Sequence, residues 1–119
     1  MAIFSTHILN SVDGTHFSNI FIKLLKISEF DKKEIIFNKK TDHGGRLKLE
    51  FNLKKDEKCE YELQVFPPKD FYEVENVENL KKNICISCFS IRVFFHKNDA
   101  TYHIPLIISP YGMSCWISR

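Results

Sequence analysis

The feature that most constrains the fold is a two-residue alternation of apolar and polar side chains, which recurs along the chain between turn signals. Its clearest instance is Arg46-Leu47-Lys48-Leu49-Glu50-Phe51. Because successive side chains of a strand point to opposite faces, this pattern is typical of a half-solvated β-strand. Asp13-Gly14 is a strong turn signal, and Pro67-Pro68 ends another alternating segment. The sequence therefore predicts a chain built mainly of strands.

Eight segments are strand candidates. They are residues 6–10, 20–27, 34–38, 46–51, 59–66, 86–96, 101–108 and 112–117. Residues 69–82 differ, because their apolar side chains recur at helical spacing, and they predict the one helix. About eight strands with one helix favour an all-β sandwich of two sheets.

The length and charge of the chain limit the number of domains it can form and the classes of partner it can bind. With 119 residues, we expect residues 1–119 to form a single domain. The formal net charge of +2, from 17 basic and 15 acidic side chains, provides no large field to attract a nucleic acid or an anionic membrane. No apolar run approaches the roughly 20 residues that span a bilayer, and the N-terminus does not read as a leader. We expect a soluble, cytoplasmic protein without nucleic-acid or membrane partners.

The four cysteines, Cys59, Cys85, Cys88 and Cys115, are expected to be thiols in a reducing compartment. Cys85 and Cys88 have the two-residue spacing that is familiar from zinc and redox sites. On a strand, however, their sulfur atoms would lie on opposite faces. We therefore expect small buried hydrophobic side chains and no metal site.

Three polar side chains on predicted strands are candidates for a functional site. If Ile104 faces the core, strand alternation places His103 on the opposite face, and the same argument places His7 opposite Ile8. Arg46 begins its strand directly after two glycines, which let the backbone turn sharply. His7, Arg46 and His103 are thus able to face one polar site.

Taken alone, a histidine on a solvent-facing strand is usually without function, and an arginine after a turn is usually just a solvated charge. The other histidines, His16, His43 and His96, have settings that nothing in the sequence distinguishes. Periodicity therefore does not by itself select His7 and His103.

Three ordered motifs do select them. They are Thr6-His7-Ile8-Leu9-Asn10 followed by Asp13-Gly14, then Thr41-Asp42-His43-Gly44-Gly45-Arg46-Leu47, and finally the block from His103-Ile104-Pro105-Leu106 to Ser109-Pro110-Tyr111-Gly112. In this order and over nearly the whole chain, the sequence resembles the transthyretin-related 5-hydroxyisourate hydrolases.

The resemblance implies a fold and an activity. The fold is a transthyretin-like (prealbumin-like) Greek-key sandwich of two four-stranded sheets, assembled as a homotetramer with sites at the dimer-dimer interface. The activity is hydrolysis of 5-hydroxyisourate to 2-oxo-4-hydroxy-4-carboxy-5-ureidoimidazoline in urate (purine) degradation, without a metal or an organic cofactor. The implied partner is thus a small purine-derived substrate.

The resemblance also implies the site residues. His7, Arg46 and His103 match the catalytic positions, and the implied substrate-binding residues are His7, Arg46, Ser114, Trp116 and Arg119. An imidazole, with a pKa of about 6.5, suits the base that activates water, although the residues leave open which histidine is that base. A guanidinium presents a planar fork of donors for carbonyl oxygens. Hormone-carrying transthyretins lack this set of side chains, so its presence favours the enzyme.

The end of the chain departs from the family pattern. The family closes with Tyr-Arg-Gly-Ser, whereas this chain closes with Trp116-Ile117-Ser118-Arg119. The indole retains a flat ring and one donor but no phenolic proton. Arg119 either reaches back to the place of the missing arginine or is solvated, with Ile117 at a subunit contact. The alternatives are therefore a catalytically impaired small-molecule binding protein, or a hydrolase for a different cyclic ureide.

Overall fold

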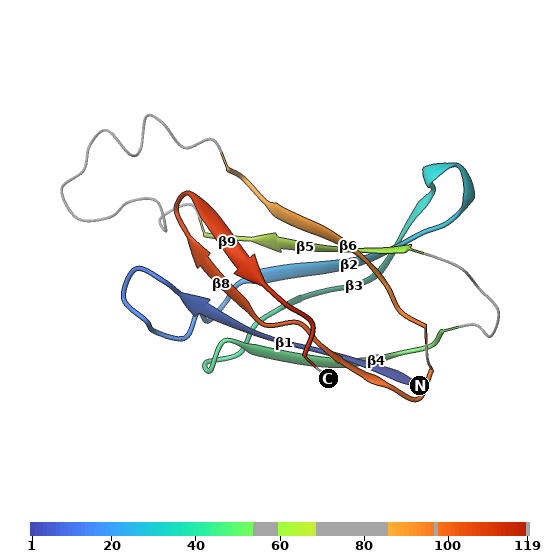
Figure 1. Cartoon of the computed structure of the whole chain (residues 1–119), viewed down its shortest axis with the longest axis horizontal. Helices are drawn as coiled ribbons and strands as arrows, with labels where there is room; N and C mark the ends of the chain where they lie inside the picture. Colours follow the sequence, from blue (N-terminus) through green and yellow to red (C-terminus); the bar gives the residue numbers. More distant parts are fainter. Residues whose placement is uncertain (54–59, 69–85, 97, 119) are drawn as a thin grey trace.

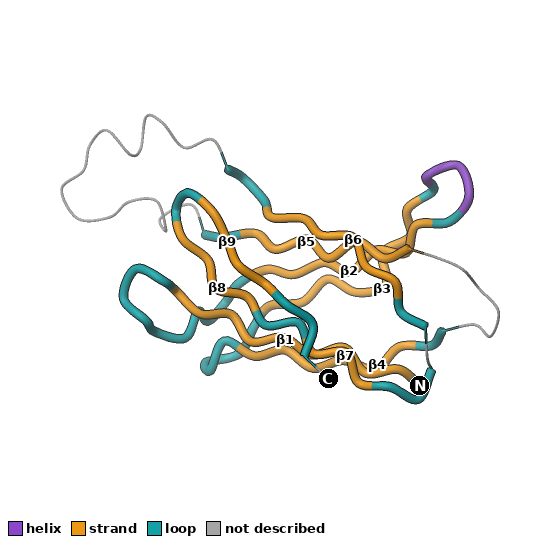
Figure 2. The backbone as a smooth tube through the Cα atoms, in the orientation of Figure 1, coloured by secondary structure: helices purple, strands orange, loops and turns teal. Residues whose placement is uncertain are grey.

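The structure, a computed structural model, describes residues 1–53, 60–68, 86–96 and 98–118. Its strands are β1 (Ala2–Asn10), β2 (Phe21–Ile27), β3 (Lys33–Lys40), β4 (Arg46–Phe51), β5 (Glu60–Phe66), β6 (Phe89–Phe94), β7 (Thr101–His103), β8 (Leu106–Ser109) and β9 (Gly112–Cys115). A short 3-10 helix, η1 (Glu29–Asp31), lies at the tip of the β2–β3 hairpin (Figure 2).

The strands form two sheets that face each other (Figure 1). One sheet has the order β4-β1-β8-β9, with β7 also paired to β1, and the other has the order β3-β2-β5-β6. β1 is antiparallel to β4 but parallel to both β7 and β8. The expected all-β sandwich of two sheets is thereby confirmed.

The predicted strand 101–108 is divided in two, because Ile104 and Pro105 interrupt it. Proline has no amide hydrogen to donate to a neighbouring strand. Thr6 stabilises the break, since its buried Oγ1 donates to the carbonyl oxygen of Ile104 at 2.6 Å. β7 and β8 consequently lie one after the other along the same side of β1. The predicted four-strand sheet therefore contains five separate strand segments.

The core lies between the sheets and follows the predicted alternation. Side chains of β1 are alternately buried and partly exposed, with Phe4, Thr6 and Ile8 inward. The opposite sheet contributes inward side chains from each of its inner strands, among them Ile22, Leu24, Leu63 and Val65. Each large apolar side chain buried in this way stabilises the fold by about 1.5–3 kcal/mol.

Several predicted boundaries shift where strand pairing decides them. β1 begins at Ala2 rather than at residue 6, because its first residues pair with the end of β4. β6 covers only 89–94 of the predicted 86–96, which is the stretch that pairs with β5. β9 ends at Cys115, where its pairing with β8 stops, rather than at residue 117. The predicted helix 69–82, together with Cys59 and Cys85, lies outside the described residues.

Candidate functional site

His7 occupies the middle of β1 and points away from the core. Its neighbours Thr6 and Ile8 are buried, so alternation turns the imidazole to the outer face of the sheet, where it is half-buried. This is the facing that the sequence predicts. His7 therefore combines a rigid backbone position with a side chain that remains accessible.

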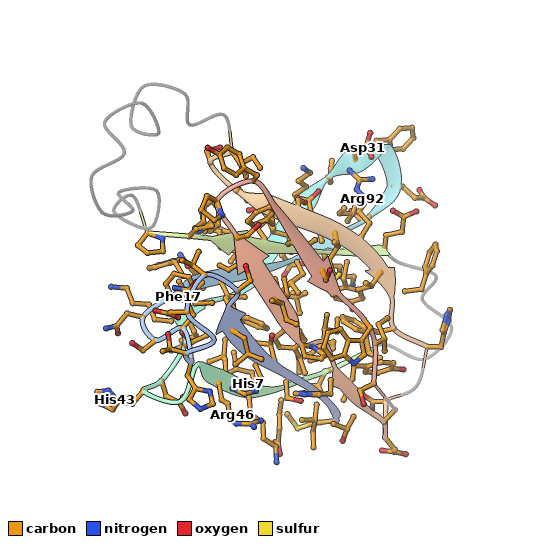
Figure 3. All side chains as sticks on the ribbon, turned by 60° about the vertical axis from the view of Figure 1, so that its left-hand side comes forward. His7, Phe17, Asp31, His43, Arg46 and Arg92 are labelled. Carbon is orange, nitrogen blue, oxygen red and sulfur yellow. The ribbon has the colours of Figure 1, made fainter. Side chains whose placement is uncertain are left out.

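Arg46 is placed directly opposite His7 in the antiparallel pairing of β1 and β4, and its side chain is exposed. Residues paired across a strand share a sheet face, so the guanidinium and the imidazole lie on the same side. Figure 3 shows His7 and Arg46 next to each other, with His43 farther out. The structure thus brings together the first two predicted site residues.

The turn before Arg46 is tied to its place by hydrogen bonds. The Asp42 Oδ1 atom accepts from the amides of Gly44 and Arg46, both at 2.9 Å. Gly45 has a positive φ of 71°, and a Cβ atom there would lie 2.6 Å from the carbonyl oxygen of Ile8. Only glycine fits such a close approach in this backbone conformation. The carbonyl oxygen of Gly45 in turn accepts from the Ile8 amide at 2.8 Å.

His103 is the last residue of β7 and reaches the same sheet face through a different pairing. It lies opposite Ser5 in the parallel register of β1 and β7, and Ser5 is two residues from His7. The Oγ atom of Ser5 lies 2.7 Å from Nδ1 of His103. Like Arg46, His103 lowers the pKa of His7 electrostatically. All three predicted residues are therefore neighbours on the outer face.

His16 is a member of this cluster that the sequence did not single out. The chain folds back after Asn10, and His16 forms an isolated bridge with Leu9. Its Nδ1 atom lies 2.8 Å from Nε2 of His7, and the two rings lie side by side with their centroids 4.9 Å apart. The sequence feature that could have indicated this contact is the Asp13-Gly14 turn, which lies between His7 and His16.

The electrostatic surroundings favour the neutral form of His7. Burial lowers the pKa of His7 below its ordinary value of 6.5, and Arg46, His16 and His103 lower it further. A hydrogen bond with the backbone of Gly44 acts in the opposite direction without cancelling these effects. A neutral imidazole can both donate and accept a hydrogen bond, whereas an imidazolium only donates.

The C-terminal segment runs beside His103. The amide of Ser118 donates to the carbonyl oxygen of His103 at 2.8 Å, so the divergent tail is anchored at the cluster. Ser114 is exposed on β9 opposite Ile107, and Trp116 is 50% exposed. Ile117, also exposed, does not pack into the core. Arg119 lies outside the described residues.

The cysteines do not add a second chemical centre to the described parts of the molecule. Cys88 and Cys115 are half-buried free thiols, and burial raises the pKa of both. Within residues 1–53, 60–68, 86–96 and 98–118, no three His, Cys, Asp or Glu side chains are grouped so as to hold a metal ion. In the same ranges, no helix is long and apolar enough to cross a membrane.

Comparison with known proteins agrees with the fold. A 5-hydroxyisourate hydrolase of Pseudomonas aeruginosa is 29% identical over 116 residues, covering 98% of this chain and 90% of its own. The Klebsiella pneumoniae 5-hydroxyisourate hydrolase structure has a TM-score of 0.68 at 21% identity, with 100% of both chains covered. An (S)-allantoin synthase structure has a TM-score of 0.74 at 20% identity, and the match covers 99% of this chain but only 44% of that one. The profile of the HIUase/Transthyretin family matches residues 4–117, and the chain belongs to that family.

Proposed function

We propose that this protein hydrolyses 5-hydroxyisourate to 2-oxo-4-hydroxy-4-carboxy-5-ureidoimidazoline. The observation that carries the proposal is the direct pairing of His7 with Arg46, with His103 beside them on the same outer sheet face. Family membership and the name of the Pseudomonas aeruginosa relative support the same reaction. Two imidazoles and a guanidinium suit the water-dependent opening of a cyclic amide, because they supply a base near neutral pH and donors for the developing negative charge.

We assign the role of general base to His103. Its Nδ1 is engaged by Ser5, while no hydrogen bond to its Nε2 occurs among the described residues. By contrast, Nε2 of His7 is already engaged by His16. His103 Nε2 therefore removes a proton from water as the oxygen attacks a ring carbonyl carbon. The imidazolium then returns that proton to the departing ring nitrogen as the carbon–nitrogen bond breaks.

Arg46 and His7 act on the substrate rather than on the attacking water. The guanidinium of Arg46 donates to the carbonyl oxygen, where negative charge develops during attack. The fixed imidazole of His7 orients the ring alongside it. The product acid loses a proton to solvent at neutral pH, so the proton count balances without a metal or an organic cofactor in these steps.

The direct test generates 5-hydroxyisourate with urate oxidase and follows its ultraviolet decay with and without the protein. We expect acceleration over spontaneous decay, with losses of about 100-fold or more in His103→Asn and in Arg46→Gln. His96→Asn, which changes an exposed histidine after β6, serves as the matched control and should retain full activity. A folded wild-type sample that gives no acceleration would rule out the proposed reaction.

The altered tail supports a second candidate, a small-molecule binding protein with impaired turnover. The half-exposed indole of Trp116 and the exposed side chain of Ile117 follow directly after β9, close to the segment anchored at His103. An aromatic ring offers a stacking surface for a flat ligand. Quenching of Trp116 fluorescence by a stable ureide, without hydrolysis of 5-hydroxyisourate, would favour this second function. Arg119→Ala tests whether the terminal arginine contributes to turnover.

The proposal includes a cytoplasmic homotetramer with its sites at the dimer-dimer interface. It is supported by family membership and by the exposed position of the cluster, which an adjoining subunit would enclose. Analytical ultracentrifugation should give a species of four times 14.0 kDa. A monomer that is fully active would contradict a shared site.

A further inference from the structure

His7 and His16 form a contact pair on the outer face of the β1 sheet. Two atoms define the hydrogen bond, Nε2 of His7 and Nδ1 of His16, and they are 2.8 Å apart. The planes of the rings differ by only 28° and their centroids are 4.9 Å apart, so the two rings lie side by side, close to one plane, and are joined through this contact. A hydrogen bond between nearly coplanar rings restrains both the position and the rotation of each ring.

The segment that carries His16 is itself held to β1. The Thr15 amide and hydroxyl both donate to Oδ1 of Asp13, and the carbonyl oxygen of Thr15 accepts from the Asn10 amide at 2.8 Å. On the other side of His16, the Phe17 amide donates to the carbonyl oxygen of Ile8 at 2.9 Å. His16 is therefore presented from a backbone fixed on both sides, rather than from a free loop.

We infer that His16 is a positioning residue, which together with the backbone of Gly44 fixes the ring orientation of His7. One proton lies between the two facing nitrogen atoms, so the tautomers of the two neutral rings are coupled: when one ring donates, the other accepts. His7 is then held as an oriented polar group, and the proton chemistry falls to His103. This assignment rests on the proposed hydrolysis and deepens it, because it gives the two catalytic histidines different roles.

The surroundings of His7 predict how the loss of His16 will act. The charged and titratable groups facing His7 are Arg46 from β4, His103 from β7 and His16 from the β1–β2 segment. Each of them lowers the pKa of His7. Removing His16 therefore raises that pKa, and it also removes one of the hydrogen bonds that hold the ring. Activity that requires neutral His7 should then fail at a higher pH than in the wild type.

Three variants separate the contributions. His16→Phe keeps a flat ring but removes the hydrogen bond, whereas His16→Asn keeps a polar group close to the position of Nδ1. His43→Phe makes the same change at an exposed histidine of the neighbouring turn and is the matched control. Nitrogen-15 spectra of the imidazoles, assigned with His7→Asn, report the tautomer and the titration of His7 without any substrate.

In wild-type protein we expect His7 in a single tautomer. In His16→Phe we expect shifted ring-nitrogen signals of His7, a raised pKa of His7, and kcat lowered about threefold to tenfold with KM changed less than about twofold. His16→Asn should recover most of kcat, and His43→Phe should match wild type.

Unchanged His7 spectra in His16→Phe would overturn the inference, whatever the activity. Changed spectra with unaltered kcat and an unaltered pH profile would overturn it as well, because the contact would then be merely structural. If the wild type does not hydrolyse 5-hydroxyisourate, the proposed function fails separately. Altered spectra in His16→Phe would still support the control of His7 by His16.

Discussion

Ser5 and His103 are joined by a short hydrogen bond, with 2.7 Å between Oγ of the hydroxyl and Nδ1 of the imidazole. They lie 98 residues apart in the sequence and meet because β1 and β7 pair in parallel with these two residues opposite each other. A partner on Nδ1 restrains the imidazole, and when the hydroxyl accepts from Nδ1, the other nitrogen, Nε2, is the basic one. The proposed base is thus oriented by the fold itself.

Replacing Ser5 with alanine should impair catalysis without unfolding the protein. The change removes the orienting hydroxyl from a half-buried position, so we expect kcat to fall about threefold to tenfold. Ser5→Thr keeps a hydroxyl in a strand and should stay within about twofold of wild type. Steady-state kinetics on freshly generated 5-hydroxyisourate measures both. Equal kcat values in Ser5→Ala and wild type would show that His103 needs no orientation by Ser5.

Two glycines with positive φ should respond differently to alanine. At Gly45 a new Cβ atom would lie 2.6 Å from the Ile8 carbonyl oxygen, whereas at Gly14 it would meet nothing within 4 Å. Both changes impose left-handed backbone strain of about 1–2 kcal/mol, but only Gly45→Ala also forces the β4 turn away from β1. Urea denaturation should therefore show a larger loss of unfolding free energy for Gly45→Ala, accompanied by reduced activity. Equal losses would contradict the close packing beside His7 and Arg46.

The fold was largely predictable because its signals are local. Residues 46–51 alternate so regularly that the predicted strand matches β4 from end to end. The full length of β1 was not predictable, since it depends on pairing with Phe51 and its neighbours, far along the chain. The division between β7 and β8 did have a signal. Pro105 lies inside the predicted strand, and proline cannot donate to a neighbouring strand.

The site was predictable only in part, because some of its features follow from local sequence and others depend on strand pairing. Period-two alternation gives the facing of His7 and His103, because it depends on neighbouring residues alone. Their proximity depends on which strands pair, and the resemblance, rather than the pattern, indicated it. Ser5 and His16 were missed because each reaches the site through a contact that the local sequence does not encode. Ser5 reaches the site through the parallel pairing of β1 and β7, and His16 reaches it through the fold-back of the chain after Asn10.

Thr41 should be important for stability although it takes no part in the proposed chemistry. Its buried Oγ1 accepts from the Ile20 amide at 2.9 Å and donates to the carbonyl oxygen of Phe17 at 2.8 Å. Thr41→Val keeps the shape but leaves the Ile20 amide without this acceptor, at a cost of about 1–3 kcal/mol. Thr101→Val, at an exposed position, should change stability by less than about 0.5 kcal/mol. Urea denaturation of the two variants checks this difference, and equal effects would contradict it.

The lowered pKa of His7 predicts how stability depends on pH. The folded protein holds a proton on this ring less readily than the unfolded chain, whose histidine titrates near the ordinary value of 6.5. Above pH 6.5 both states are neutral at this position and the stability contribution is fully present. As the pH falls through 6.5 toward the lower folded pKa, the unfolded chain takes up the proton first, so the free energy of unfolding decreases.

Replacing His7 with asparagine removes this titration. The decrease in unfolding free energy between pH 7.5 and pH 5 should therefore be smaller in His7→Asn than in wild type, as measured by urea denaturation at both values. His43→Asn removes an exposed histidine in the neighbouring turn and tests whether the effect belongs to His7. Because His7 is only half-buried, added salt should weaken the part of the effect that arises from Arg46. A decrease that is the same in wild type and in His7→Asn would show that burial and the neighbouring charges do not lower the pKa of His7.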